Sequence, residues 1–186
     1  MNKKVFWSKA IWPNDNIAEI TCMGGWSMRG YANGFLEIAS IASEKAIENK
    51  CAIDTIMPAI LYNIRHSVEL FLKFVLFEIS EKSGHKITAE DHRIKDTFNK
   101  YKDLIRMFLE TEHYMVAFSH EKWLNDFEGI INHVDAFDSD GQKTRYPTDK
   151  KGKPNLGGKA IVSTSDVYCL IEYIQSYYDE YNSRGT

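Results

Sequence analysis

The sequence is poor in cysteine, and its three cysteines lie far apart. Cys22, Cys51 and Cys169 form no CxxC pair, which argues against a disulfide framework and against a cysteine-based zinc motif. No uncharged apolar run approaches the roughly 20 residues that a membrane-spanning helix needs. The N-terminus starts with basic residues but has no apolar segment of the kind that a signal peptide carries. We therefore expect reduced thiols in a cytoplasmic protein that has no membrane partner.

The chain also lacks a strong charge of either sign. Its 186 residues have a formal net charge of −3, with 44% hydrophobic and 26% charged residues. This composition is ordinary for a soluble globular protein, and the length fits a single domain over residues 1–186. Because the net charge is negative, any contact with nucleic acid has to come from a local basic patch.

The motifs of common catalytic and cofactor sites are absent. There is no GxGxxG, no HExxH and no nucleophile elbow. Residues 152–159, GKPNLGGK, resemble a phosphate-binding loop, but they contain an extra glycine, and Ala160 stands where Ser or Thr should hold the metal. No histidine lies at metal-ligand spacing from a cysteine. The sequence predicts no cofactor, and it leaves open only a metal site assembled from residues distant in the chain.

What the sequence does have is one long apolar segment of helical period, residues 56–79. Its apolar side chains recur at steps of three and four and cover most of the helix circumference, which places the helix in the middle of an all-α bundle. They are Ile60, Leu61, Ile64, Val68, Leu70, Phe71, Leu72, Phe74, Val75, Phe77 and Ile79. Pro58 is tolerated only in a first turn, so the helix is expected to begin near Met57.

Four further segments are predicted to be helices, which makes a compact bundle of about five helices. They span residues 31–49, 94–110, 120–137 and 163–182. The first of them should form an antiparallel hairpin with the central helix. Gly84 is expected to end the central helix, Ser119 to cap the fourth, and Ser163 with Asp166 to form a capping box. Residues 1–30 are expected to be an irregular cover, in which Trp7, Trp12 and Trp26 pack on the bundle as a lid. Any β-strands of the protein are expected only within these residues.

A polar stripe interrupts the central helix. Tyr62, His66, Glu69 and Lys73 follow one another at steps of four, three and four, with Arg65 beside Glu69. One interpretation is a solvated edge with surface ion pairs worth about 0.3–0.5 kcal/mol each. The other is that these charges lie on a mostly buried helix and must be partnered, because an unpaired buried charge is costly. Such a stripe would organise a neighbouring loop or a ligand.

The segment before the last helix, residues 138–159, is long, polar and basic. It holds six Lys or Arg against three Asp, with four glycines and two prolines. A loop of this length inside a compact domain is often functional or disordered. It is either a flexible, soluble loop or a binding element, in which Arg145 and Lys150 grip phosphate and Tyr146 stacks on a base.

The central helix carries a family resemblance. RHSVELFLK at residues 65–73, followed by Gly84 and His85, resembles the RHxxELxLK … GH pattern of HEPN-type helical domains. RYPTDKKG at residues 145–152 resembles a loop motif of bacterial proteins that share this pattern. The resemblance implies a bundle of about five helices in a bacterial or phage defence, toxin–antitoxin or regulatory system. It also implies an antitoxin or a nucleotidyltransferase as protein partner.

Catalytic members of this family are metal-independent ribonucleases, usually homodimers, in which four to six residues separate an arginine from a following histidine. Arg106 and His113 fit that spacing, although Met107 departs from the polar residue that often follows the arginine. The histidine would exchange a proton with a ribose hydroxyl and the arginine would stabilise the phosphate; otherwise both are surface residues. One alternative is a non-catalytic module that binds a nucleotide, RNA or a protein. Its candidate binding residues are Arg65, His66, Glu69, Lys73, Arg145, Tyr146 and Lys150. A third possibility is a purely structural subunit.

Overall fold

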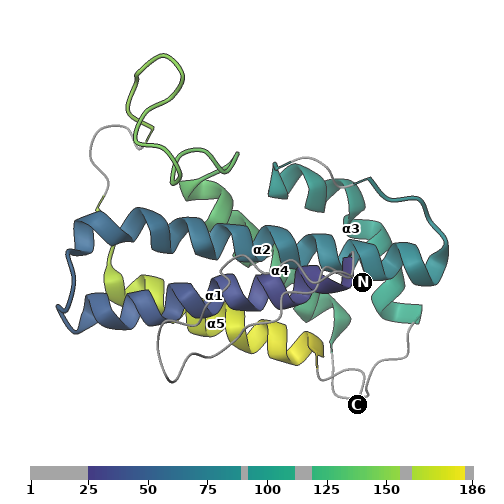
Figure 1. The fold of residues 1–186 in the computed structure, drawn as a ribbon. Helices are drawn as coiled ribbons and strands as arrows, with labels where there is room; N and C mark the ends of the chain where they lie inside the picture. Colours follow the sequence, from purple (N-terminus) through teal and green to yellow (C-terminus); the bar gives the residue numbers. More distant parts are fainter. Residues whose placement is uncertain (1–24, 89–91, 112–118, 156–160, 183–186) are drawn as a thin grey trace, which may run out of the picture.

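The protein is an all-α bundle, seen in a computed structural model that describes residues 25–88, 92–111, 119–155 and 161–182 (Figure 1). The described residues form five helices: α1 (Gly25–Ile47), α2 (Ile53–Ser83), α3 (Ile94–Thr111), α4 (His120–Phe137) and α5 (Thr164–Asn182). They contain no strand, and their one β-bridge joins Thr148 to Pro154. No helix among them is long and apolar enough to cross a membrane. The predicted fold class is confirmed.

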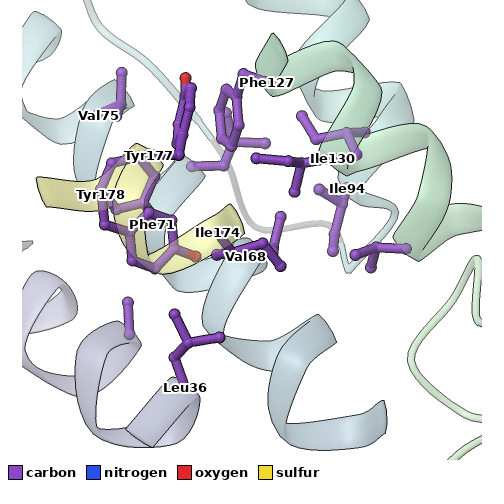
Figure 2. Close-up of a cluster of buried hydrophobic side chains, with 14 of the residues drawn as sticks. Leu36, Val68, Phe71, Val75, Ile94, Phe127, Ile130, Ile174, Tyr177 and Tyr178 are labelled. Carbon is purple, nitrogen blue, oxygen red and sulfur yellow. The ribbon is translucent and has the colours of Figure 1, made fainter. Parts of the chain in front are cut away.

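Helix α2 is the centre of the bundle, as its apolar pattern predicts. It runs antiparallel to α1, and the other helices pack around this pair (Figure 1). Phe71 is fully buried in the middle of α2 (Figure 2). Its ring stacks on Tyr178 of α5 at 3.9 Å between centroids and meets Phe127 of α4 edge-on at 5.8 Å. Three helices therefore share one aromatic core, in which such ring pairs add stability beyond the area that they bury.

The helix ends follow the predicted capping residues. Gly84 has a φ of 70°, and its N–H donates to the carbonyl of Ser80. The hydroxyl of Ser119 accepts from the N–H of Lys122 at 3.2 Å, and that of Ser163 accepts from the N–H of Asp166 at 3.2 Å. These bonds satisfy backbone groups that have no partner inside the helix.

Two helices begin earlier than predicted. Helix α1 starts at Gly25 instead of residue 31, so residues 25–30 are helical. The reason is packing: Met28 lies on the core face together with Ala32 and Leu36, which outweighs the low helix propensity of the glycines. Helix α2 starts at Ile53, so Pro58 lies beyond its first turn. Of the predicted lid, Trp7 and Trp12 lie outside the described residues, as do the predicted strands before residue 25, whereas Trp26 lies within α1 and not in an irregular segment.

Candidate functional site

The centre of the polar stripe is a buried ion pair. The side chains of Arg65 and Glu69 are only 2% and 5% exposed, and Arg65 Nη1 lies 2.8 Å from Glu69 Oε2. The second oxygen of Glu69, Oε1, accepts from Lys73 Nζ and from His92 Nδ1, each at 2.9 Å. Burial by itself would raise the pKa of Glu69, but the hydrogen bonds from Lys73, Arg65 and His92 hold that pKa below its ordinary value. Arg65 and Glu69 are therefore partnered, as the second interpretation of the stripe requires.

Arg65 also ties two loops to α2. Its Nε donates to the carbonyl oxygen of Asp138 at 2.8 Å, just after α4. Its Nη2 donates to the carbonyl of His92, just before α3. Gly141 covers the guanidinium so closely that a Cβ at this position would lie 2.8 Å from Nη1. The buried arginine therefore has all three of its nitrogens engaged and is not free to bind a ligand.

Asp138 fixes the start of the basic loop. Its carboxylate accepts from the N–H groups of Lys143 and Thr144 at 3.2 and 3.1 Å and from the Thr144 hydroxyl at 2.5 Å. Burial would raise the pKa of Asp138, but these hydrogen bonds and the nearby charge of Arg65 hold that pKa below its ordinary value. A carboxylate that accepts several hydrogen bonds inside the protein makes residues 138–144 an ordered base for the rest of the loop.

Residues 146–155, which we call the basic hairpin, continue that order outward. The N–H of Asp149 donates to the carbonyl of Lys153 at 2.8 Å, and that of Gly152 donates back to the carbonyl of Asp149 at 3.0 Å. The Asp149 carboxylate accepts from the N–H groups of Lys151 and Lys153 at 2.8 and 2.9 Å. Gly152 has a φ of 77°, as a tight turn with a glycine bulge requires. The hairpin projects beyond the helices (Figure 1) and exposes Lys150 at its tip.

Four side chains form a second cluster where the loop meets α2, which we call the aromatic–arginine cluster: Tyr62, His66, Arg145 and Tyr146. The guanidinium carbon of Arg145 lies 5.5 Å from the ring centroid of Tyr62 and 5.4 Å from that of Tyr146. The other side chain, His66, stacks on Tyr62 at 5.5 Å with an interplanar angle of 10°. Arg145 is exposed, and no carboxylate within the described ranges forms an ion pair with it. An exposed arginine that is held by aromatic rings can accept an anionic ligand.

The electrostatic surroundings keep His66 neutral. Burial is the main reason that its pKa is lowered from the ordinary 6.5. Glu69 opposes this shift, whereas the charges of Arg65, Lys73 and Arg145 lower the pKa further. The imidazole therefore stays in its neutral form at neutral pH, with one nitrogen as donor and the other as acceptor.

Of the two residues in the predicted catalytic pair, the structure describes only Arg106. The Nε of Arg106 lies 2.7 Å from Glu121 Oε1, and its Nη1 lies 2.7 Å from Asp103 Oδ1. Two carboxylates thus hold the guanidinium that the ribonuclease hypothesis assigns to phosphate. His113 lies outside the described residues, so the pairing of Arg106 with His113 stays a prediction.

The structure brings the predicted binding residues into two neighbouring groups. Arg65, Glu69 and Lys73 belong to the buried ion network, and His66, Arg145 and Tyr146 belong to the aromatic–arginine cluster, with Lys150 farther out on the hairpin. Sequence reasoning missed Asp138, Gly141 and His92 as members of the site. Their contacts to Arg65 link residues 27 to 76 positions apart, and no local pattern encodes them. In the part of the chain that the structure describes, no group of His, Cys, Asp and Glu could hold a metal ion.

Comparison of the chain with protein-family models, with curated proteins and with solved structures found no match.

Proposed function

We propose that this protein is a HEPN-like helical module that binds nucleotides, either free or within a single strand, at the aromatic–arginine cluster. The five-helix bundle supports the HEPN-like part of the proposal, together with the motifs RHSVELFLK and RYPTDKKG. A role in a defence, toxin–antitoxin or regulatory system, with a homodimer and a protein partner, belongs to the same proposal.

The observation that carries the binding proposal is the contrast between two arginines. Arg65 is buried, and its three nitrogens donate hydrogen bonds to Glu69, Asp138 and His92. Arg145 lies on the surface against two tyrosine rings, and no described carboxylate neutralises it. A planar guanidinium binds a phosphate through two parallel hydrogen bonds, and exposed tyrosine rings stack on bases without regard to sequence. Phosphate and base are the two groups that a nucleotide offers together.

The buried network supports the same proposal by holding Arg145 in place. Arg65 and Asp138 anchor the loop seven residues before Arg145, and the hydrogen bonds of Asn155 close it afterwards: its Nδ2 donates to the carbonyl of Tyr146 at 2.8 Å. A binding group that is already ordered loses less conformational entropy when the ligand arrives. The network thus positions the site without contacting the ligand.

The proposal is tested by the affinity of the protein for a fluorescein-labelled single-stranded RNA of mixed sequence at low salt. We expect Arg145→Ala to weaken binding about tenfold or more, since a charge-assisted hydrogen-bond pair is worth about 1.5–3 kcal/mol. The affinity of Arg145→Lys should lie between those of the wild type and Arg145→Ala, because the point charge of a lysine does not replace the planar guanidinium. The matched control is Arg29→Ala, which removes the same charge from an exposed position on α1. Equal affinities of the wild type and Arg145→Ala, with unchanged circular dichroism, would overturn the proposal.

A further inference from the structure

His66 is the member of the aromatic–arginine cluster that the proposed function does not use. Its ring is fixed on two sides: it stacks on Tyr62, and the ring of Phe35 meets it edge-on at 4.5 Å between centroids with an interplanar angle of 83°. These two ring contacts place the imidazole beside Tyr62, which Arg145 covers. His66 is thus a polar group at the edge of the proposed nucleotide site.

The hydrogen-bonding state of His66 differs from that of other histidines in the described ranges. One ring nitrogen, Nδ1, has a protein partner in each of His85, His92 and His133. Both ring nitrogens of the half-buried His66 lack one among the described residues. Polar groups at such positions are generally satisfied by protein, by water or by a ligand. As far as the described residues go, His66 thus has a free donor and a free acceptor next to Arg145.

The neutral state of this ring selects the kind of ligand group that it can bind. A phosphate offers only acceptors and favours a cation, whereas a hydroxyl both donates and accepts, which matches a neutral imidazole. The phosphate of a bound nucleotide is already assigned to Arg145, and its base to the tyrosine rings. The sugar, which links phosphate and base, then lies between these groups and beside His66.

We propose that His66 hydrogen-bonds to the ribose 2′-hydroxyl and makes the site select ribonucleotides over deoxyribonucleotides. The proposal rests on the proposed function, because it takes the phosphate position from Arg145. It adds a specificity-determining residue and makes RNA or ribonucleotides the preferred ligand, since the 2′-hydroxyl is the group that distinguishes RNA from DNA.

The test compares labelled oligouridine with oligodeoxyuridine of the same length, so that only the 2′-hydroxyl differs. We expect the wild type to bind the ribose strand about fivefold more tightly, as one hydrogen bond between neutral groups allows. His66→Phe keeps the ring stack and removes both nitrogens. It should bring the ratio of the two affinities to about one and leave the affinity for the deoxyribose strand within about twofold. His133→Phe on α4 is the control and should keep the wild-type ratio.

The outcomes separate this proposal from the proposed function. Equal wild-type affinities for the two strands would overturn the role of His66 and leave the nucleotide site intact. A ribose preference that persists in His66→Phe would also overturn it. If the wild type binds neither strand, the proposed function fails and this inference fails with it. The wild-type comparison needs no variant, so equal affinities overturn the role of His66 even if His66→Phe does not fold, and we repeat this comparison with a 2′-O-methyl strand. A 2′-O-methyl strand bound as tightly as the ribose strand would contradict donation from the ribose hydroxyl.

Discussion

At the scale of the residue, two arginines of the same chain have opposite roles, and their surroundings determine which role each has. Arg65 is buried because Glu69 neutralises it and two backbone carbonyls accept hydrogen bonds from its Nε and Nη2. A buried ion pair of this kind adds little net stability over an apolar core, but the removal of one partner is strongly destabilising. Arg145 has no such partner among the described residues and stays exposed. The first residue builds the site, and the second is available to a ligand.

Removal of the Glu69 carboxylate should therefore lower the free energy of unfolding by more than the loss of a surface ion pair does. We expect Glu69→Ala to lower the free energy of unfolding by about 2–4 kcal/mol, because Arg65 stays buried without its anion. Urea denaturation measures this decrease. The control is Glu48→Ala, which removes an exposed carboxylate near Lys45 and Lys50 and should cost less than about 1 kcal/mol. A decrease below about 0.5 kcal/mol for Glu69→Ala would show that the stripe behaves as a solvated edge.

The lowered pKa of Glu69 also predicts how the stability of the protein depends on acidic pH. The folded-state pKa of Glu69 lies below the ordinary 4.5, so its stabilising contribution is present above about pH 4.5 and is lost as the pH falls through the folded-state pKa. The difference in stability between the wild type and Glu69→Ala should therefore shrink as the pH is lowered below 4.5. A difference that stays constant down to the acid transition would contradict the assigned role of the carboxylate.

The ribonuclease hypothesis also belongs to the residue scale. It predicts RNA cleavage in excess chelator that leaves 2′,3′-cyclic phosphate ends, and that disappears in both Arg106→Ala and His113→Ala while the fold persists. In the structure, Asp103 and Glu121 hold Arg106, so the arginine would have to exchange these carboxylates for phosphate. Cleavage that survives both substitutions would exclude the pair as a catalytic site.

At the scale of the element, helices follow from local patterns and the loop does not. The period of the apolar residues is enough to predict α3 and α4 to within a residue. It misses the starts of α1 and α2, where contacts with distant residues extend the helix past glycines and Pro58. The order in residues 138–155 rests on Asp138, Asp149 and Asn155, which hydrogen-bond to the backbone. Composition alone indicates only a soluble segment, so the ordered loop could not be predicted from polarity. The sequence likewise predicts Arg145 and Tyr146 as candidate binding residues, but it does not predict the contacts that position them.

Substitution of two glycines in the loop can distinguish the cost of backbone strain from the cost of a clash with Arg65. Gly141 and Gly152 have similar φ values, 74° and 77°, but a Cβ would strike the Arg65 guanidinium at Gly141 and meet nothing within 4 Å at Gly152. Gly152→Ala should cost about 1–2 kcal/mol from the left-handed backbone alone. Gly141→Ala carries the same strain and displaces the buried arginine as well, so it should cost more. Thermal or urea denaturation of the two variants measures the difference, and equal decreases in stability would contradict the close packing of Gly141 on Arg65.

At the scale of the whole molecule, a slightly acidic bundle carries one projecting basic loop. The formal net charge of −3 leaves no general attraction to nucleic acid, so the proposed binding of RNA has to depend on Arg145 and the neighbouring lysines. Helix α2 joins the two parts, because one of its faces builds the core through Phe71 and another holds the loop through Arg65. We therefore predict a ligand site at one place on the surface, with the rest of the bundle as its support.

The most direct measurement of this central claim is the salt dependence of RNA binding by the wild type and by Arg145→Ala. The slope of log Kobs against log salt should become shallower by about 0.7 for each single-strand phosphate that the protein no longer neutralises. We predict this reduction for Arg145→Ala and an unchanged slope for Arg29→Ala. Equal slopes for the wild type and Arg145→Ala, or an equal reduction in Arg29→Ala, would contradict a phosphate site at Arg145.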